Sequence, residues 1–248
     1  MRILTLGDSW TYGEESSDPA TMSWPAQMSK NYNIEVVNLG RGGSSLERAC
    51  RIGIEELCRN RDYEFVVLPL VPLNRTEVLQ NGKWRQIWPA KNVNGKIIEA
   101  QVRSRYNGLD KIYTEFWMPW NDIQKMMLQT LQFASFVKSI GIPLYMCSLS
   151  NFIFNYKVEL GWITDYKNDN NFKSLGMPLS SFDIGIQDLN RKLQSLRAIH
   201  NHNLGLVPDY ITDASYLTKN HLAAGWHPVD DGYAILADYF AEKIGLGR

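Results

Sequence analysis

A serine follows the first apolar run of the chain, in a setting that could present it as a nucleophile. The run at residues 3–6 (ILTL) stops abruptly at GDSWTYG, residues 7–13, which contains Ser9. A sharp turn between a strand and a helix lifts a small polar side chain out of a sheet, which is how nucleophiles are often presented. The same residues also suit a plain turn in which Asp8 or Ser9 caps a helix, so both interpretations stay open on this segment alone.

Three further groups that could assist such a serine lie at the ends of other predicted elements. NLGRGGSS at 38–45 has three glycines in four positions, and its uncovered backbone N–H groups, including that of Gly43, suit an anion or oxyanion. Asn74 follows the third apolar run, and His227 precedes the last predicted helix. A tight glycine turn or a structural histidine would explain each feature singly. Together they suit acyl transfer through a serine nucleophile and a histidine base.

The elements that must position these groups alternate between short apolar runs and helical periodicity. Strands are predicted at 3–6, 34–38, 65–68, 144–147 and 204–207, and helices at 46–60, 121–140, 183–202 and 230–244. This order predicts a flavodoxin-like, doubly wound α/β/α sandwich with a central five-stranded parallel sheet. Ligands of such sheets bind beyond the carboxyl ends of the strands, so we expect these groups to meet at one edge.

Two segments interrupt this repeat and are predicted to decorate the active edge. Residues 77–118 contain QNGKW and NVNGK, whose Asn-Gly pairs are strong hairpin signals, and residues 150–180 are rich in Asn, Lys and aromatic residues. We expect residues 1–248 to form a single domain that carries both segments. Tryptophans in the first segment could contact substrate or form its own small core. The candidates for substrate contact are Trp10, Trp84, Trp88 and Trp226.

Composition and charge limit the classes of partner. Lys plus Arg and Asp plus Glu both number 26, so no nucleic-acid partner is expected. Cys50, Cys58 and Cys147 lack the close spacing of zinc or redox sites, so we expect buried thiols, no metal and no other cofactor. No leader precedes the first strand, and no apolar stretch approaches the ~18 residues of a membrane span. We therefore expect a soluble, cytoplasmic protein; its oligomeric state stays open.

The segments that carry these groups resemble, in order, the four sequence blocks of the SGNH-hydrolase superfamily, the GDSL-like esterases and lipases. GDSWTYG resembles the first block and NLGRGGSS the second, while PLNR at 72–75 and AGWHP at 224–228 stand at the third and fourth. The resemblance implies that Ser9 is the nucleophile and His227 the base. It further implies an oxyanion hole formed by the amides of Ser9 and Gly43 and the side chain of Asn74.

The chain departs from the family pattern in its third and fourth blocks. Pro72 and Arg75 replace a glycine and an acid, and Ala224 stands where the family has the aspartate that orients the histidine. Three explanations stay open: a backbone carbonyl orients His227, another acid reaches it, or the site is weakened. From this departure we expect Ala224→Asp to raise kcat by about 10²- to 10⁴-fold, whereas equal rates would mean that another group already orients His227. The alternative acids considered are Asp213, Asp230 and Asp231.

The resemblance implies an ester hydrolase. The aromatic segments favour an O-acyl (acetyl) esterase that acts on a carbohydrate, with a small-molecule or glycan ester as its partner. An alternative is a catalytically impaired binding module with the same fold, which Ala224 favours and the intact Ser9 and His227 oppose. A further alternative, a nucleotide-binding protein that uses GRGGSS, would bind nucleotide tightly even after Ser9→Ala.

Overall fold

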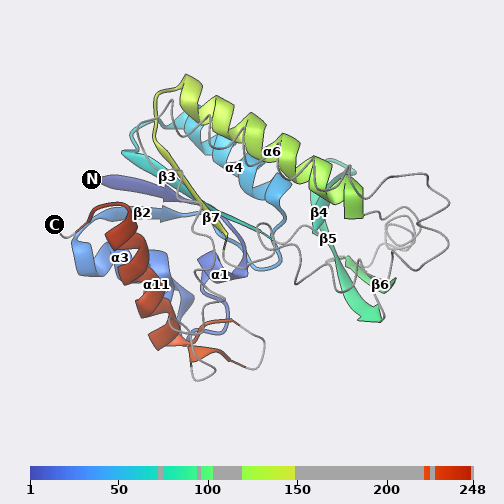
Figure 1. Ribbon diagram of the computed structural model, residues 1–248, viewed down its shortest axis with the longest axis horizontal. Helices are drawn as coiled ribbons and strands as arrows, with labels where there is room; N and C mark the ends of the chain where they lie inside the picture. Colours follow the sequence, from blue (N-terminus) through green and yellow to red (C-terminus); the bar gives the residue numbers. More distant parts are fainter. Residues whose placement is uncertain (72–74, 94–95, 103–118, 149–220, 224–226, 247–248) are drawn as a thin grey trace.

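A parallel sheet forms the centre of the molecule in the computed structural model, which describes residues 1–71, 75–93, 96–102, 119–148, 221–223 and 227–246 (Figure 1). Its strands lie in the order β2-β1-β3-β7, and every neighbouring pair is parallel. Their bounds are β1 Arg2–Thr5, β2 Glu35–Asn38, β3 Phe65–Leu70 and β7 Leu144–Ser148. The predicted α/β class and parallel sheet are therefore confirmed.

Helices cover both faces of this sheet (Figure 1). Ile3 of β1 and Val67 of β3 pack against α3 and α11, in one apolar cluster with Trp24 and Tyr233. Their neighbour Leu4 points to the other face, into a cluster with residues of α4 and α6. This alternation is the period of two that a strand imposes on its side chains. The helices are α1 Ser9–Tyr12, α2 Pro19–Met22, α3 Trp24–Tyr32, α4 Leu46–Arg59, α6 Pro119–Ser139 and α11 Asp230–Lys243.

Most predicted elements that fall in the described ranges are confirmed to within a few residues. β3 is buried at every position, as its continuous apolar run indicates. The predicted strand at 204–207 and helix at 183–202 lie outside the described residues, so the five-strand count stays a prediction beside the four strands observed. The short helices α2 and α3 were not predicted, although a capping Asp18 and Pro19 at the first helical position mark the start of α2.

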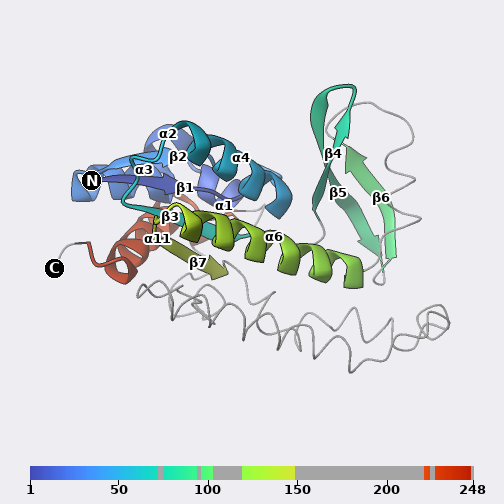
Figure 2. The ribbon, with the colours of Figure 1, turned by 90° about the horizontal axis from the view of Figure 1, so that it is seen from above.

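A second, antiparallel sheet follows β3 and consists of β4 Thr76–Gln80, β5 Lys83–Val93 and β6 Lys96–Val102. Asn81 and Gly82 have φ of 50° and 72°, as a tight hairpin turn requires, so the first hairpin predicted within 77–118 is confirmed. Arg51 of α4 donates two hydrogen bonds to the buried carboxylate of Glu77, at 2.8 and 3.0 Å. Figure 2 shows this small sheet standing beside the parallel one. Residues 150–180 lie outside the described part, and the single-domain organisation stays a prediction.

The two cysteines of α4 lie in different environments. Cys50 is buried, and burial raises the pKa of its thiol. Cys58 is exposed, so the prediction of a buried thiol was wrong for this residue. Eight residues along a helix leave two side chains about 80° apart around its axis, which places the second thiol beyond the buried face. Within the described ranges, no helix is long and apolar enough to cross a membrane.

Candidate active site

The carboxyl ends of β1 and β3 lie where the chain changes its direction across the sheet. From β1 the chain moves to β2 at one edge, and then returns to β3 on the other side of β1. Open α/β sheets bind their ligands in the crevice at such a switch point. Ser9 follows β1 directly, and Arg75 follows β3. The sequence blocks that contain these two residues therefore lie at the same edge of the sheet.

Ser9 is the first residue of α1 and is held by a tight turn. Gly7 has a φ of 136°, and a Cβ at this position would collide with the side chain of Thr11. Asp8 caps the helix by accepting a hydrogen bond from the Trp10 amide at 3.1 Å. Ser9 is only 2% exposed, and its Oγ has no hydrogen-bond partner among the described residues. Buried hydroxyls are usually paired, so an unpaired one at this edge needs a functional explanation.

The glycine-rich segment packs directly against this turn. The side chain of Asn38 donates to the carbonyl of Thr11 at 2.8 Å and accepts from the amide of Gly40 at 2.9 Å. A Cβ at Gly40 would lie 2.8 Å from the backbone nitrogen of Tyr12, so only glycine permits this approach. Asn38 is thus a residue that sequence reasoning did not single out, although it begins the second block.

Two backbone amides remain unused in this part of the structure. Gly43 has a φ of 70°, which turns the chain before α4. Neither the Ser9 amide nor the Gly43 amide donates a hydrogen bond to any described residue. Free amides next to a buried serine can stabilise a developing oxyanion.

Arg75 joins three of the four sequence blocks. Its Nη1 lies 2.8 Å from Oδ2 of Asp8 and donates to the carbonyl of Ser44 at 3.5 Å. The Asp8 side chain is 7% exposed, so Arg75 supplies the opposite charge that a buried carboxylate needs. Arg75, which stands where the family has an acid, therefore has a structural role in this chain as the partner of Asp8. Asn74 itself lies outside the described residues.

His227 lies in a short hairpin that leads into α11. The amide of Ala223 donates to the carbonyl of His227 at 2.8 Å, and the amide of Val229 donates to the carbonyl of His221 at 2.9 Å. The His227 ring faces a carboxylate, with Nδ1 2.8 Å from Oε2 of Glu15. Ala224 and Trp226 lie outside the described part of the chain.

The acids suggested from the sequence do not fill this position in the described structure. Asp230 accepts hydrogen bonds from the amide and hydroxyl of Ser17, at 2.9 and 2.6 Å. Asp231 is exposed in the first turn of α11, and Asp213 is not described. Glu15 was missed because it follows the first block and is far from His227 in sequence. The available signal was the acidic pair that directly follows GDSWTYG.

Tyr233 links α11 to the segment that follows Ser9. Its hydroxyl donates to the carbonyl of Glu14 at 2.8 Å. Burial raises the pKa of Tyr233, and the neighbouring charges of Asp8, Glu14 and Glu15 raise this pKa further. The phenol is therefore held as a neutral hydrogen-bond donor at physiological pH.

The tryptophans predicted to contact substrate occupy different environments. Trp10 is half-buried against the cluster that contains Tyr233. Trp84 is 47% exposed on β5, with its ring 4.5 Å from the guanidinium carbon of Arg51. Trp88 also lies in β5, but its side chain, like all of Trp226, is outside the described part. Their contact with substrate stays a prediction.

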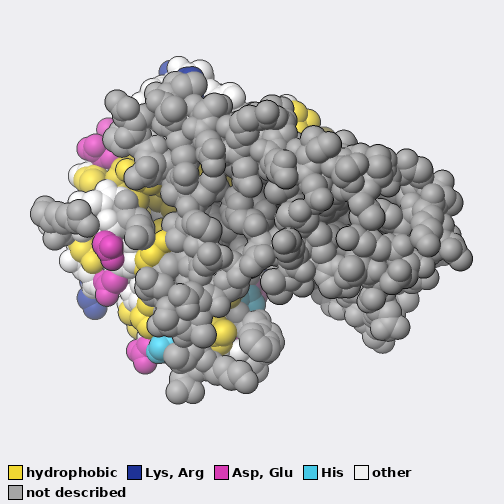
Figure 3. Space-filling view, in the orientation of Figure 1, with side chains coloured by type: hydrophobic (Ala, Val, Ile, Leu, Met, Phe, Trp, Pro, Cys, Tyr) yellow, Lys and Arg dark blue, Asp and Glu magenta, His cyan; other side chains and the backbone are white. Residues whose placement is uncertain are grey.

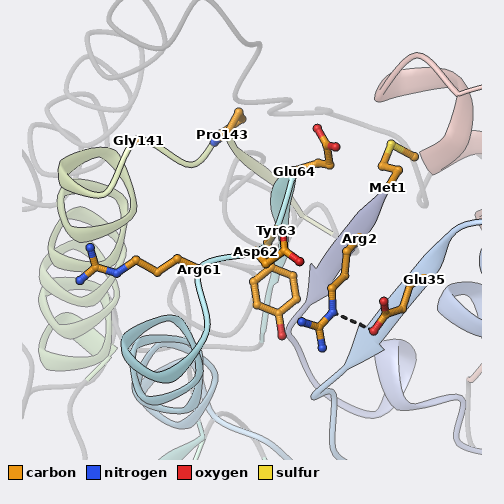
Figure 4. Close-up of a pocket in the computed structure, with 9 residues that line it drawn as sticks. All are labelled: Met1, Arg2, Glu35, Arg61, Asp62, Tyr63, Glu64, Gly141 and Pro143. Atoms are coloured by element: carbon orange, nitrogen blue, oxygen red, sulfur yellow. Dashed lines mark hydrogen bonds and ion pairs between the residues drawn. The ribbon is translucent and has the colours of Figure 1, made fainter.

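A polar pocket lies at the opposite edge of the parallel sheet. Arg2, Glu35, Glu64 and Pro143 line it, together with Tyr63 (Figure 4). The first four of these lie at the amino ends of β1, β2, β3 and β7, whereas Ser9 follows a carboxyl end. This pocket is therefore separate from the edge of the sheet at which Ser9 lies.

Side chains of several kinds reach the surface of the described part of the chain. On the face in Figure 3, hydrophobic, acidic and histidine side chains are interspersed. Among the described residues, no three His, Cys, Asp or Glu side chains are grouped closely enough to hold a metal ion.

Solved structures with the same fold span the whole chain. TesA matches with a TM-score of 0.53 at 12% identity, covering 98% of this chain and 97% of its own. A G-D-S-L-family protein from Desulfitobacterium hafniense matches with a TM-score of 0.50 at 14% identity, covering 98% of each chain. One from Veillonella parvula matches with 0.50 at 16% identity, covering 98% of this chain and 97% of its own.

These matches define the class of fold. The chain has the fold of these G-D-S-L-family structures, which is the fold that the resemblance of its sequence blocks implied. No family model matches the sequence, and no curated protein matches it significantly.

Proposed function

We propose that the protein is a serine ester hydrolase with Ser9 as its nucleophile. The observation that carries this proposal is the buried, unpaired Ser9 hydroxyl at the switch point of the sheet. The G-D-S-L fold supports it, as do the amides of Ser9 and Gly43, which donate to no acceptor among the described residues. His227 supports it further, because a carboxylate faces one nitrogen of its ring and leaves the other available as a base.

In the proposed reaction, Ser9 Oγ attacks the acyl carbon while His227 Nε2 takes the hydroxyl proton. The carbonyl oxygen becomes an oxyanion, which the amides of Ser9 and Gly43 and the side chain of Asn74 stabilise. His227 then gives its proton to the departing alcohol, leaving an acyl group on Ser9. Water attacks this acyl group with His227 again as base, which releases the acid and restores Ser9.

We further propose an O-acyl, most simply acetyl, group on a carbohydrate as the substrate. The exposed ring of Trp84 offers the kind of surface on which a sugar can stack. The alternative of a catalytically impaired carbohydrate- or ligand-binding module rested on Ala224. The carboxylate of Glu15 at His227 removes the main reason to expect impairment.

A comparison of esters tests this function. We expect the purified protein to hydrolyse p-nitrophenyl acetate, with kcat/KM falling as the acyl chain lengthens to butyrate and octanoate. We also expect it to release acetate from a chemically acetylated oligosaccharide, because the alcohol side should contribute binding energy. Hydrolysis of none of these esters would contradict the esterase assignment. A preference for octanoate without acetate release would contradict only the carbohydrate acetyl ester.

A further inference from the structure

The segment that follows α1 contacts α11 on both sides of Glu15. Before it, the carbonyl of Glu14 accepts a hydrogen bond from Tyr233 at 2.8 Å. After it, the amide and hydroxyl of Ser17 donate to Asp230, at 2.9 and 2.6 Å. Glu15 is therefore fixed between two contacts that join the N-terminal and C-terminal parts of the described chain.

Residue 15 also has an unusual backbone conformation. Its φ is 66°, in the left-handed region that a residue with a Cβ adopts only at a cost. Such a conformation persists where the surrounding contacts determine it, and it often occurs at functional sites. Here it accompanies the approach of a carboxylate to a histidine far away in the sequence.

The Glu15 carboxylate contacts both the ring and the backbone amide of His227. Its Oε2 lies 2.8 Å from the ring Nδ1 of His227 and accepts from the backbone amide of the same residue at 3.3 Å. The side chain of Glu15 is 32% exposed and that of His227 is 20% exposed, so water only partly competes for this contact. A proton held on Nδ1 by the carboxylate leaves Nε2 unprotonated and able to accept another.

We propose that Glu15 positions His227 for proton transfer, in place of the acid that the fourth sequence block lacks at Ala224. This inference rests on the proposed function of Ser9 and His227. In the chemical step, the proton of Ser9 Oγ moves to Nε2, and the Nδ1 proton stays on the ring. Glu15 remains ionised throughout and stabilises the imidazolium that forms. It does not touch the substrate, so it acts through His227 alone.

Long-range ¹H–¹⁵N spectra of the histidine rings test the positioning without any substrate. We expect His227 to carry its proton on Nδ1 in the unmodified protein. In Glu15→Gln the amide can also donate to the ring, so a mixture of tautomers or the Nε2–H form should replace this state. Glu35→Gln is the matched control, because Glu35 pairs with Arg2 at the opposite edge of the sheet, and its spectrum of His227 should not change. An unchanged His227 tautomer in Glu15→Gln would overturn the proposal.

Kinetics on p-nitrophenyl acetate provide the second test. Glu15→Gln should lower kcat by about 10²- to 10⁴-fold and leave KM within about twofold, because the wrong tautomer impairs only the chemical step. The control Glu35→Gln should stay within about twofold of the unmodified rate, as expected for a change at the opposite edge of the sheet. An unchanged kcat in Glu15→Gln, with an active unmodified protein, would contradict the role of Glu15 alone.

A rescue variant separates positioning from a loss of structure. In the Glu15→Gln background, Ala224→Asp should raise kcat by about tenfold or more. In the unmodified protein, the same substitution should change kcat less than about threefold, because the two acids would serve the same ring nitrogen. Equal gains in both backgrounds would contradict the proposal. If the tautomer shifts as expected but the unmodified protein cleaves no ester, the proposed function is wrong, whereas the positioning of His227 by Glu15 still holds.

Discussion

Replacement of Ser9 by alanine should lower kcat for p-nitrophenyl acetate by about 10⁴- to 10⁶-fold, as loss of the nucleophile does in serine hydrolases. KM should change little, because the hydroxyl contributes to the chemical step rather than to binding. The Ser9 side chain is buried without a hydrogen bond to any described residue, so its removal should also leave the melting temperature nearly unchanged. Steady-state kinetics and thermal unfolding of the two proteins provide the measurement.

Ser16→Ala is the matched control for this variant. Ser16 lies in the same segment, and its hydroxyl donates to the carbonyl of Gly13 at 2.7 Å. It should keep the rate within about threefold, since its hydroxyl makes only a local contact within the turn. If Ser9→Ala retained more than a tenth of the activity, the nucleophile would have to be another group.

His227→Ala should cause a loss of similar size, about 10⁴- to 10⁶-fold in kcat, because Ser9 without its base is a weak nucleophile. The two residues act as one unit, so the double variant Ser9→Ala/His227→Ala should be no slower than either single variant. Full kinetic comparison of the three variants tests this coupling. Losses that multiply in the double variant would show that the two residues act independently, and His227 would then not be the base for Ser9.

The position of Ser9 could be predicted because it depends on local patterns. A continuous apolar run ends at a glycine and an acid, and the order of strands and helices sets the edge at which it must lie. β3 could be predicted from its continuous apolar run, because a strand buried on both faces has no polar positions. α4 could be predicted from the helical spacing of its apolar residues. The glycines of the second block also indicated their role, since only glycine tolerates the close approach at Gly40.

The partner of His227 could not be predicted in the same way. Glu15 and His227 are 212 residues apart, and no spacing rule links the first block to the fourth. Their contact depends on the left-handed turn at Glu15 and on the docking of α11 through Tyr233, both of which are tertiary features. Arg75 is a similar case. Its role as the partner of Asp8 becomes visible only when the fold brings the two segments together.

Covalent labelling of Ser9 tests the central claim most directly. The unmodified protein, Ser9→Ala and Ser16→Ala are each incubated with an activated alkyl phosphonate, and peptide mass spectrometry locates any adduct. Reaction at a serine hydroxyl requires the same activation by His227 that ester hydrolysis requires. The account predicts one adduct on Ser9 in the unmodified protein and in Ser16→Ala, and none in Ser9→Ala. An absence of adduct in all three proteins, or an adduct that persists in Ser9→Ala, would contradict the assignment of Ser9 as the nucleophile.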